Sequence, residues 1–153
     1  MSKVLPQLHL DNQLCFSLYS LSRLVTQAYQ PLLKNLGLTY PQYLVLLVLW
    51  QAMEEKQLPV PVGFLCERLL LDTGTVTPLL KRMESAGLVE RSRSATDERV
   101  VLVGLSAQAV QLRHRAASVP ASILCSSHVS VDEAVALREE VQGFIQRWQD
   151  PAS

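Results

Sequence analysis

The sequence predicts a mainly α-helical fold that carries one small β-hairpin, and three observations support this. Apolar residues recur every three or four positions along residues 14–32 and 76–83, as they do on one face of an amphipathic helix. Two short β-rich runs, residues 88–91 and 100–103, are separated only by a polar segment. The chain has 153 residues, 48% of them hydrophobic and 18% charged, which suits one compact subunit rather than a disordered chain.

The first predicted helix covers residues 11–35. Pro31 lacks a backbone N–H, so it is expected to kink or end this helix near Gln30, and Gly37 is a suitable stop. The helix carries one apolar stripe that is close to a heptad seam: Leu14, Leu18, Leu21, Val25, Ala28 and Leu32. Such a stripe can pack on a helix of a partner subunit.

The second predicted helix covers residues 39–53. Its start has a capping-box pattern, in which Thr39 is followed three residues later by Gln42. Prolines mark the next segment, residues 54–61, as a loop. Two more helices are predicted near the C-terminus, over residues 106–119 and 131–149, and an extension of the former past Pro120 to Ser126 is also compatible with the pattern.

Between these helices lies a motif of two helices and a hairpin. A short helix over residues 62–69 is followed by a turn and by a second helix that Asp72 or Thr73 caps and Gly87 ends. The hairpin follows at once, with a polar tip at residues 92–99. This order of elements predicts a winged helix-turn-helix, whose second helix enters the major groove of duplex DNA.

Cations and hydroxyls gather on the second helix of the motif and on the hairpin. The chain has no net charge, with 14 Lys and Arg against 14 Asp and Glu, but residues 81–93 hold four cations against two carboxylates. A solvated surface explains each element taken singly, whereas the ordered combination favours DNA binding. The candidate DNA-binding residues are Thr73, Thr75, Thr77, Lys81 and Arg82 on the helix, and Arg91, Arg93 and Arg99 on the hairpin.

Several runs carry a family resemblance. Residues 71–84 (LDTGTVTPLLKRME), with Gly87-Leu88-Val89 and Asp97-Glu98-Arg99, resemble the MarR family of winged-helix regulators. Residues 15–20 (CFSLYS), 28–33 (AYQPLL) and 36–43 (LGLTYPQY) are similar to its organic-hydroperoxide-sensing branch, the OhrR-type repressors. The likeness covers residues 13–105. Around the short helix the chain departs from the family at Pro59, Pro61 and Cys66.

The resemblance implies a dimeric MarR-like architecture for the single subunit of residues 1–153. Residues 10–36 and 106–150 would form the helical dimerisation region, and residues 39–105 the DNA-binding region. In the wing, the resemblance implies that Asp97 braces the hairpin and that Arg99 faces DNA.

Cys15 is the candidate redox-sensing residue. Helical spacing places it on one face with four hydroxyl-bearing residues, Tyr19, Ser22, Thr26 and Tyr29, and O–H donors stabilise a thiolate. From the residues alone, a structural role stays open, because no Lys, Arg or His lies one turn away and a lone Cys on such a helix is more often a small buried hydrophobe. The resemblance instead implies a peroxide-reactive Cys15, with Tyr29 and Tyr40 of the other subunit bonded to the thiol and Tyr19 as a neighbour in the same chain.

Cys125 and Cys66 are expected to play different roles from each other. The resemblance implies that Cys125 forms an intersubunit disulfide with oxidised Cys15, whereas Cys66 beside Leu65 is expected to be buried and inert. Three cysteines are too few for a disulfide-stapled fold, and in a reducing cytosol they are free thiols. The three histidines lack metal-ligand spacing, so no metal or other cofactor is expected.

The predicted function is that of a DNA-binding transcriptional repressor, not an enzyme. A homodimer would hold a pseudo-palindromic operator and release it when an organic hydroperoxide, its inducer, oxidises Cys15. One alternative is a ligand-responsive regulator that binds an aromatic effector between the first, second and fifth helices, with a structural Cys15. A second is a thiol peroxidase, although no strong activating base is evident. No apolar run reaches the roughly 18 residues that a bilayer requires, and no signal peptide is visible, so the expected location is the cytoplasm without membrane contact.

Overall fold

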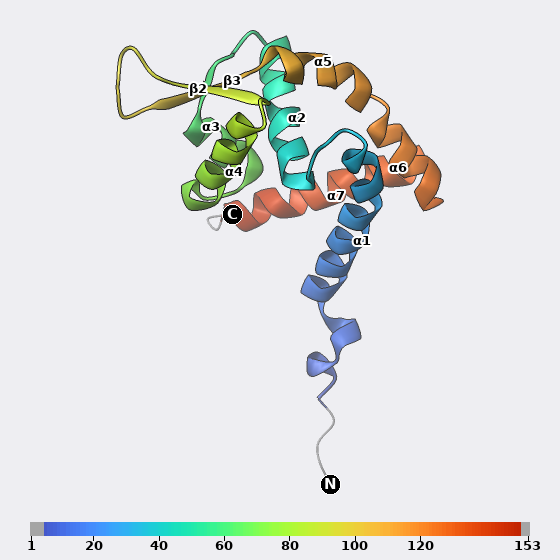
Figure 1. The fold of residues 1–153 in the computed structure, drawn as a ribbon. Coiled ribbons are helices and arrows are strands. Elements are labelled where there is room, and N and C mark those ends of the chain that lie inside the picture. Colours follow the sequence, from blue (N-terminus) through green and yellow to red (C-terminus); the bar gives the residue numbers. More distant parts are fainter. Residues whose placement is uncertain (1–4, 151–153) are drawn as a thin grey trace. The chain divides into compact units, whose positions relative to one another are not determined.

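The computed structural model describes residues 5–150, which divide into two compact units (Figure 1). The first unit extends through Ala117 and contains η1 (Pro6–Leu8), η2 (Leu10–Asn12), α1 (Leu14–Lys34), α2 (Tyr40–Glu54), β1 (Val60–Pro61), α3 (Val62–Leu69), α4 (Thr73–Ser85), β2 (Val89–Arg93), β3 (Val101–Leu105) and α5 (Ala107–Ala116). The second begins at Ser118 and contains α6 (Val119–Ser127) and α7 (Val131–Gln149). The predicted mainly helical fold with a small wing is therefore confirmed.

Helix α2 forms the centre of the first unit. Its side chains Val45, Leu46 and Leu49 are fully buried, and each such burial stabilises the fold by about 1.5–3 kcal/mol. The indole N–H of Trp50 donates a hydrogen bond to the carbonyl oxygen of Ala109 at 3.0 Å, which joins α2 to α5. The capping box predicted at the start of α2 is present, with both of its reciprocal bonds.

Helices α3 and α4 form the predicted helix-turn-helix, and α3 has the bounds that the sequence predicts. The turn between them passes through Leu70, which adopts a left-handed conformation with φ of 54°. Asp72, one of the two predicted caps, is the residue that caps α4. The predicted apolar stripe of α4 is buried as a whole: Val76, Leu79, Leu80 and Met83.

The wing belongs to a three-stranded antiparallel sheet in the order β1-β3-β2. Gly87, with φ of 70°, turns the chain from α4 into β2, and Val89 then pairs with Leu105. The prediction of a loop throughout residues 54–61 is wrong at its end, where Val60 pairs with Val103. A strand of two residues is too short to show the alternation by which strands are recognised.

The prediction for the first helix needs two corrections. The helix begins at Leu14 rather than near Asp11, because the preceding residues form the separate 3₁₀ turn η2. It also continues through Pro31 to Lys34, close to the predicted bound at residue 35, so Pro31 does not end it near Gln30. A proline removes one backbone donor, but Leu33 in the last turn is 1% exposed, and this burial favours the continued helix. Gly37 closes the end in a left-handed conformation, as predicted.

The region after the wing also differs from its prediction. The helix expected over residues 106–119 ends at Ala116, and a new helix, α6, starts at Val119. Pro120 lies in the first turn of α6, where its missing N–H costs nothing. Strand β2 extends to Arg93, so the wing tip begins later than residue 92. Helix α7 has the predicted bounds. Across residues 5–150, no helix combines the length and the apolar character that crossing a bilayer requires.

Candidate DNA interface and thiol site

The exposed face of α4 carries the predicted DNA-facing residues. Lys81 and Arg82 are exposed, and within residues 5–150 neither side chain makes a hydrogen bond or an ion pair. Thr73 and Thr75 are exposed at the start of the helix, while Thr77 is half-buried. The two cations are thus free to meet phosphates, which is what a recognition helix requires.

The start of α4 is held by its cap. The Asp72 carboxylate accepts the backbone N–H of Thr75 at 2.8 Å and the Thr75 hydroxyl at 2.9 Å. These two bonds, the hydroxyl first, lower the pKa of Asp72 below its ordinary value. The hydroxyl proton of Thr75 is therefore already used, and only the lone pairs of its oxygen remain for DNA.

The prediction that Cys66 is buried is wrong, because its side chain is half-buried. Its sulfur lies 3.8 Å from the hydroxyl oxygen of Thr73, at the first residue of α4. Leu65 takes the buried position on α3 and is 0% exposed, so the next residue, about 100° further around the helix, lies toward the edge of the core.

The wing tip is organised around one carboxylate. Asp97 accepts the backbone N–H of Arg99 at 3.0 Å and its Nε at 3.1 Å, and these bonds, the side-chain one first, lower the pKa of Asp97. The side chain of Arg99 is still 91% exposed. Arg93 donates from its guanidinium to the carbonyl oxygen of Glu98 at 2.6 Å. The tip is thereby closed on itself while Arg99 stays accessible.

Arg91 differs from the other cations predicted to bind DNA. Its guanidinium donates twice to one carboxylate oxygen of Glu84, from Nε at 2.9 Å and from Nη2 at 2.6 Å. Its side chain is only 22% exposed. Arg91 in β2 is therefore bound to α4 rather than free. The fold, with exposed cations on one helix and at the wing tip, is that of a winged-helix DNA-binding protein.

Three tyrosines form a cluster between α1 and α2. The ring of Tyr29 lies 5.2 Å from that of Tyr40 and 5.8 Å from that of Tyr43, between centroids. Burial raises the pKa of Tyr29, with a smaller contribution from Tyr40, and burial also raises the pKa of Tyr40. For Tyr43, burial first and the two neighbours second raise the pKa to about 12. All three therefore keep their O–H donors at neutral pH.

The structure brings together two of the three predicted thiol-pocket tyrosines and adds one. Tyr43 was not predicted, although its position three residues after Tyr40 on one helix was a usable signal. Tyr19 lies apart from the cluster, 60% exposed, with the Arg23 guanidinium 5.7 Å from its ring centroid.

The sensor candidate Cys15 is exposed in the first turn of α1. Within residues 5–150, no hydrogen bond joins it to Tyr29 or Tyr40 of its own chain. Cys125, the candidate second thiol, is exposed in α6 of the second unit. The described subunit thus leaves both thiols accessible and unbonded.

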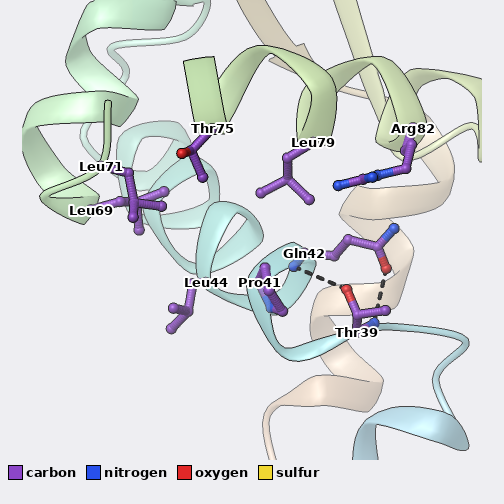
Figure 2. A pocket seen from close by; sticks show the side chains of 9 residues that line it. All are labelled: Thr39, Pro41, Gln42, Leu44, Leu69, Leu71, Thr75, Leu79 and Arg82. Carbon is purple, nitrogen blue, oxygen red and sulfur yellow. Dashed lines mark hydrogen bonds between the residues drawn. The ribbon is translucent and has the colours of Figure 1, made fainter. Parts of the chain in front are cut away.

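An apolar hollow of about 580 Å³ lies beside the recognition helix (Figure 2). Its leucines come from α2, from the end of α3, from the turn and from α4, and Arg82 lies at one end. This is not where the ligand-responsive alternative expects an effector, between the first, second and fifth helices. The residues that line the hollow are Thr39, Pro41, Gln42, Leu44, Leu69, Leu71, Thr75, Leu79 and Arg82.

Comparison with known proteins agrees with this fold. Residues 27–115 match the family model described as transcriptional regulator SarA/Rot. The chain is 44% identical over 137 residues to the organic hydroperoxide resistance transcriptional regulator of Bacillus subtilis, covering 90% of each chain. It is similar to the structure of reduced AbfR bound to DNA, with 37% identity, a TM-score of 0.72, and 94% and 96% of the two chains covered. Disulfide-formed AbfR matches with 35% identity, a TM-score of 0.61 and 95% of each chain covered.

A winged-helix regulator of transcription is the class of protein that this fold defines. More particularly, the chain belongs to the MarR family, in its OhrR-type branch. The relatives are regulators with a DNA-binding fold and not enzymes, as predicted.

Proposed function

We propose that this chain is a cytoplasmic homodimeric repressor that binds a pseudo-palindromic operator and releases it when an organic hydroperoxide oxidises Cys15. The DNA-facing residues of the proposal are the exposed cations Lys81, Arg82 and Arg99, with hydroxyls at the start of α4. Two recognition helices related by a two-fold axis would read the two halves of the operator. The relative from Bacillus subtilis, named for organic hydroperoxide resistance, supports this choice of inducer.

The observation that carries the proposal is the combination of an exposed Cys15 with a cluster of protonated tyrosines on the same subunit. Tyr29 and Tyr40 present O–H groups that can stabilise a thiolate, and Cys15 of their own chain makes no bond to them. In a dimer, Cys15 of one subunit would reach the tyrosines of the other. The aromatic rings also provide an apolar surface for the organic tail of the peroxide.

The chemistry needs only the thiolate and the peroxide. The sulfur of Cys15 attacks one peroxide oxygen, the O–O bond breaks, and the alkoxide leaves and takes up a proton to become an alcohol. The sulfur is oxidised to a sulfenic acid and the peroxide is reduced. Condensation with the thiol of Cys125 of the partner subunit then forms a disulfide and releases one water.

The test is Cys15→Ser. This variant should fold and bind the operator about as well as the parent, because the exchange of one sulfur for one oxygen removes little volume and the tyrosine hydroxyls can pair with the serine. It should remain on DNA after treatment with cumene hydroperoxide, whereas the parent should dissociate and rebind after dithiothreitol. Fluorescence anisotropy on labelled operator measures both states, and melting curves serve as the control for folding.

The same assay separates the alternatives. Peroxide-triggered release by Cys15→Ser would refute the sensor assignment. A ligand-responsive regulator would keep both binding and release by an aromatic effector in this variant. A thiol peroxidase is tested by a second measurement, since catalytic consumption of hydroperoxide beyond one equivalent per subunit would favour it.

A further inference from the structure

The ion pair between Glu84 and Arg91 connects the two elements that would contact DNA. Glu84 lies in the last turn of α4, and Arg91 lies in the middle of β2. Both Arg91 nitrogens, Nε and Nη2, donate to the same oxygen of Glu84, and charge-assisted bonds of this kind are the stronger ones. The pair therefore bridges the end of the recognition helix and the base of the wing.

The backbone joins these elements at a short turn, where the N–H of Gly87 donates to the carbonyl oxygen of Glu84 and the N–H of Leu88 to that of Met83, each at 2.9 Å. Gly87 has a φ of 70°, a conformation that favours glycine, and these bonds end before Arg91 is reached. Beyond the turn, Arg91 is held in register opposite Val103 in the strand pair, so its position follows that of the whole hairpin. A bond from Arg91 to α4 thus transmits the position of the helix to the wing.

The charges in this region distinguish Arg91 from its neighbours. Arg82 and Lys81 are exposed and without partners among the described residues, and Arg99 is 91% exposed although bound to Asp97. The side chain of Arg91 is 22% exposed, and its charge is neutralised by Glu84. A guanidinium that is mostly buried and paired with a carboxylate is poorly placed to meet a phosphate.

We propose that Glu84 and Arg91 form a brace that sets the orientation of the wing relative to the recognition helix. Both are positioning residues for operator binding, and neither contacts DNA. This inference rests on the proposed function, because operator affinity is its readout. It assigns a role to the carboxylate of Glu84, which as an isolated charge would only repel the phosphate backbone.

The sign of the effect at Glu84 separates a brace from a phosphate contact. If the pair is a brace, Glu84→Ala and Arg91→Ala each weaken operator binding by about threefold to tenfold. The double variant then binds no more weakly than either single variant. The slope of log affinity against log salt concentration is unchanged. If Arg91 contacted a phosphate, Arg91→Ala would reduce the slope by about one, and Glu84→Ala would strengthen binding by freeing a cation.

Two further variants control for charge. Glu90→Ala removes a carboxylate from the same strand that makes no bond among the described residues, so it reports the charge effect alone. The exchange Glu84→Arg with Arg91→Glu keeps the total charge and can re-form the pair in reverse. A brace predicts binding within about twofold of the parent for the exchange, whereas a phosphate contact predicts a loss.

Anisotropy titrations at several salt concentrations, with melting curves for every variant, complete the test. Binding by Glu84→Ala that equals or exceeds that of the parent overturns the brace. A change in melting temperature shared by both single variants without any change in affinity also overturns it, because the pair would then be structural only. If the parent does not bind the operator at all, the proposed function is refuted. The pair itself is then tested by whether the two substitutions lower the melting temperature by less together than the sum of their single effects.

Discussion

Arg99 is exposed to solvent although Asp97 holds its backbone and side chain in place. Its backbone N–H and its side chain both bind Asp97, yet 91% of the side chain remains in solvent. An exposed ion pair of this kind adds little to stability, so we propose that the carboxylate directs the arginine rather than holding the fold together. A directed arginine at a wing tip can reach a minor groove or its phosphates.

Replacing Arg99 by Ala should therefore weaken operator binding and flatten the log–log salt slope by about one unit, because one phosphate contact is lost. The melting temperature should not change, since the side chain buries almost nothing. Arg99→Lys, which keeps the charge, is the matched control and should retain the slope. An Arg99→Ala variant with the affinity and the slope of the parent would remove the wing from the DNA interface.

At the scale of elements, the tyrosine cluster joins α1 to α2. Tyr29 from α1 meets Tyr40 and Tyr43 from α2, and Tyr43 continues the contact to Trp50, whose ring centroid lies 6.5 Å away. Tyr43 is 2% exposed, which accounts for its pKa of about 12. The cluster thus combines packing with O–H donors that ionise only in strong alkali.

This raised pKa has a defined consequence for stability. Between pH 10 and about 12 the folded chain holds a proton on Tyr43 that the unfolded chain has released, so the free energy of unfolding falls as pH rises through this window. The melting temperature of Tyr43→Phe should fall less between pH 8 and pH 11 than that of the parent. Tyr19→Phe, at an exposed tyrosine, is the control. Equal losses in the parent and in Tyr43→Phe would contradict the burial of this hydroxyl.

Elements with strong local signals could be predicted from the sequence. The short helix α3, the Asp72 cap, the buried stripe of α4 and the end at Gly87 follow from local rules, and the structure confirms them. Where tertiary packing decides, prediction failed. Pro31 was expected to kink or end α1 near Gln30, but the helix continues to Lys34, and the burial of Leu33 two residues further on outweighs one missing hydrogen bond.

The site was predictable to a smaller extent. Tyr40 came from a family resemblance, Tyr29 came from the resemblance and from helical spacing, and the structure brings their rings together. A sequence gives charges but not partners, so Arg91 was grouped with the free cations although Glu84 binds it. Pairing between residues seven apart across a turn depends on how β2 leaves α4, which local rules do not specify.

At the scale of the molecule, the N-terminal helix exposes much apolar surface. Leu14, Leu18 and Leu24 of α1 are 53%, 41% and 64% exposed, and Trp148 of α7 is 78% exposed. Apolar stripes of this length on a helix usually mark an interface. We therefore keep residues 10–36 and 106–150 as the proposed dimerisation region, and residues 39–105 as the proposed DNA-binding region.

The proposed switch depends on thiols in different units, since Cys15 lies in the first and Cys125 in the second. A disulfide between them across two subunits would link the units of opposite chains and could move the recognition helices. Cys125→Ser should still consume one equivalent of hydroperoxide at Cys15, because the attacking sulfur is intact. It should not give the dimer-sized band that the oxidised parent shows on a non-reducing gel.

Cys66→Ser is the matched control for this last prediction, because it removes a half-buried thiol beside Thr73 rather than an exposed one. The oxidised control should keep the dimer-sized band. Cys15→Ser should lose the band together with the reaction, since no sulfenic acid forms. A band that persists in Cys125→Ser, is absent in Cys15→Ser and disappears when Cys66 is also replaced would assign the second thiol to Cys66. Disulfide formation would then act at the start of α4 itself, rather than through the second unit.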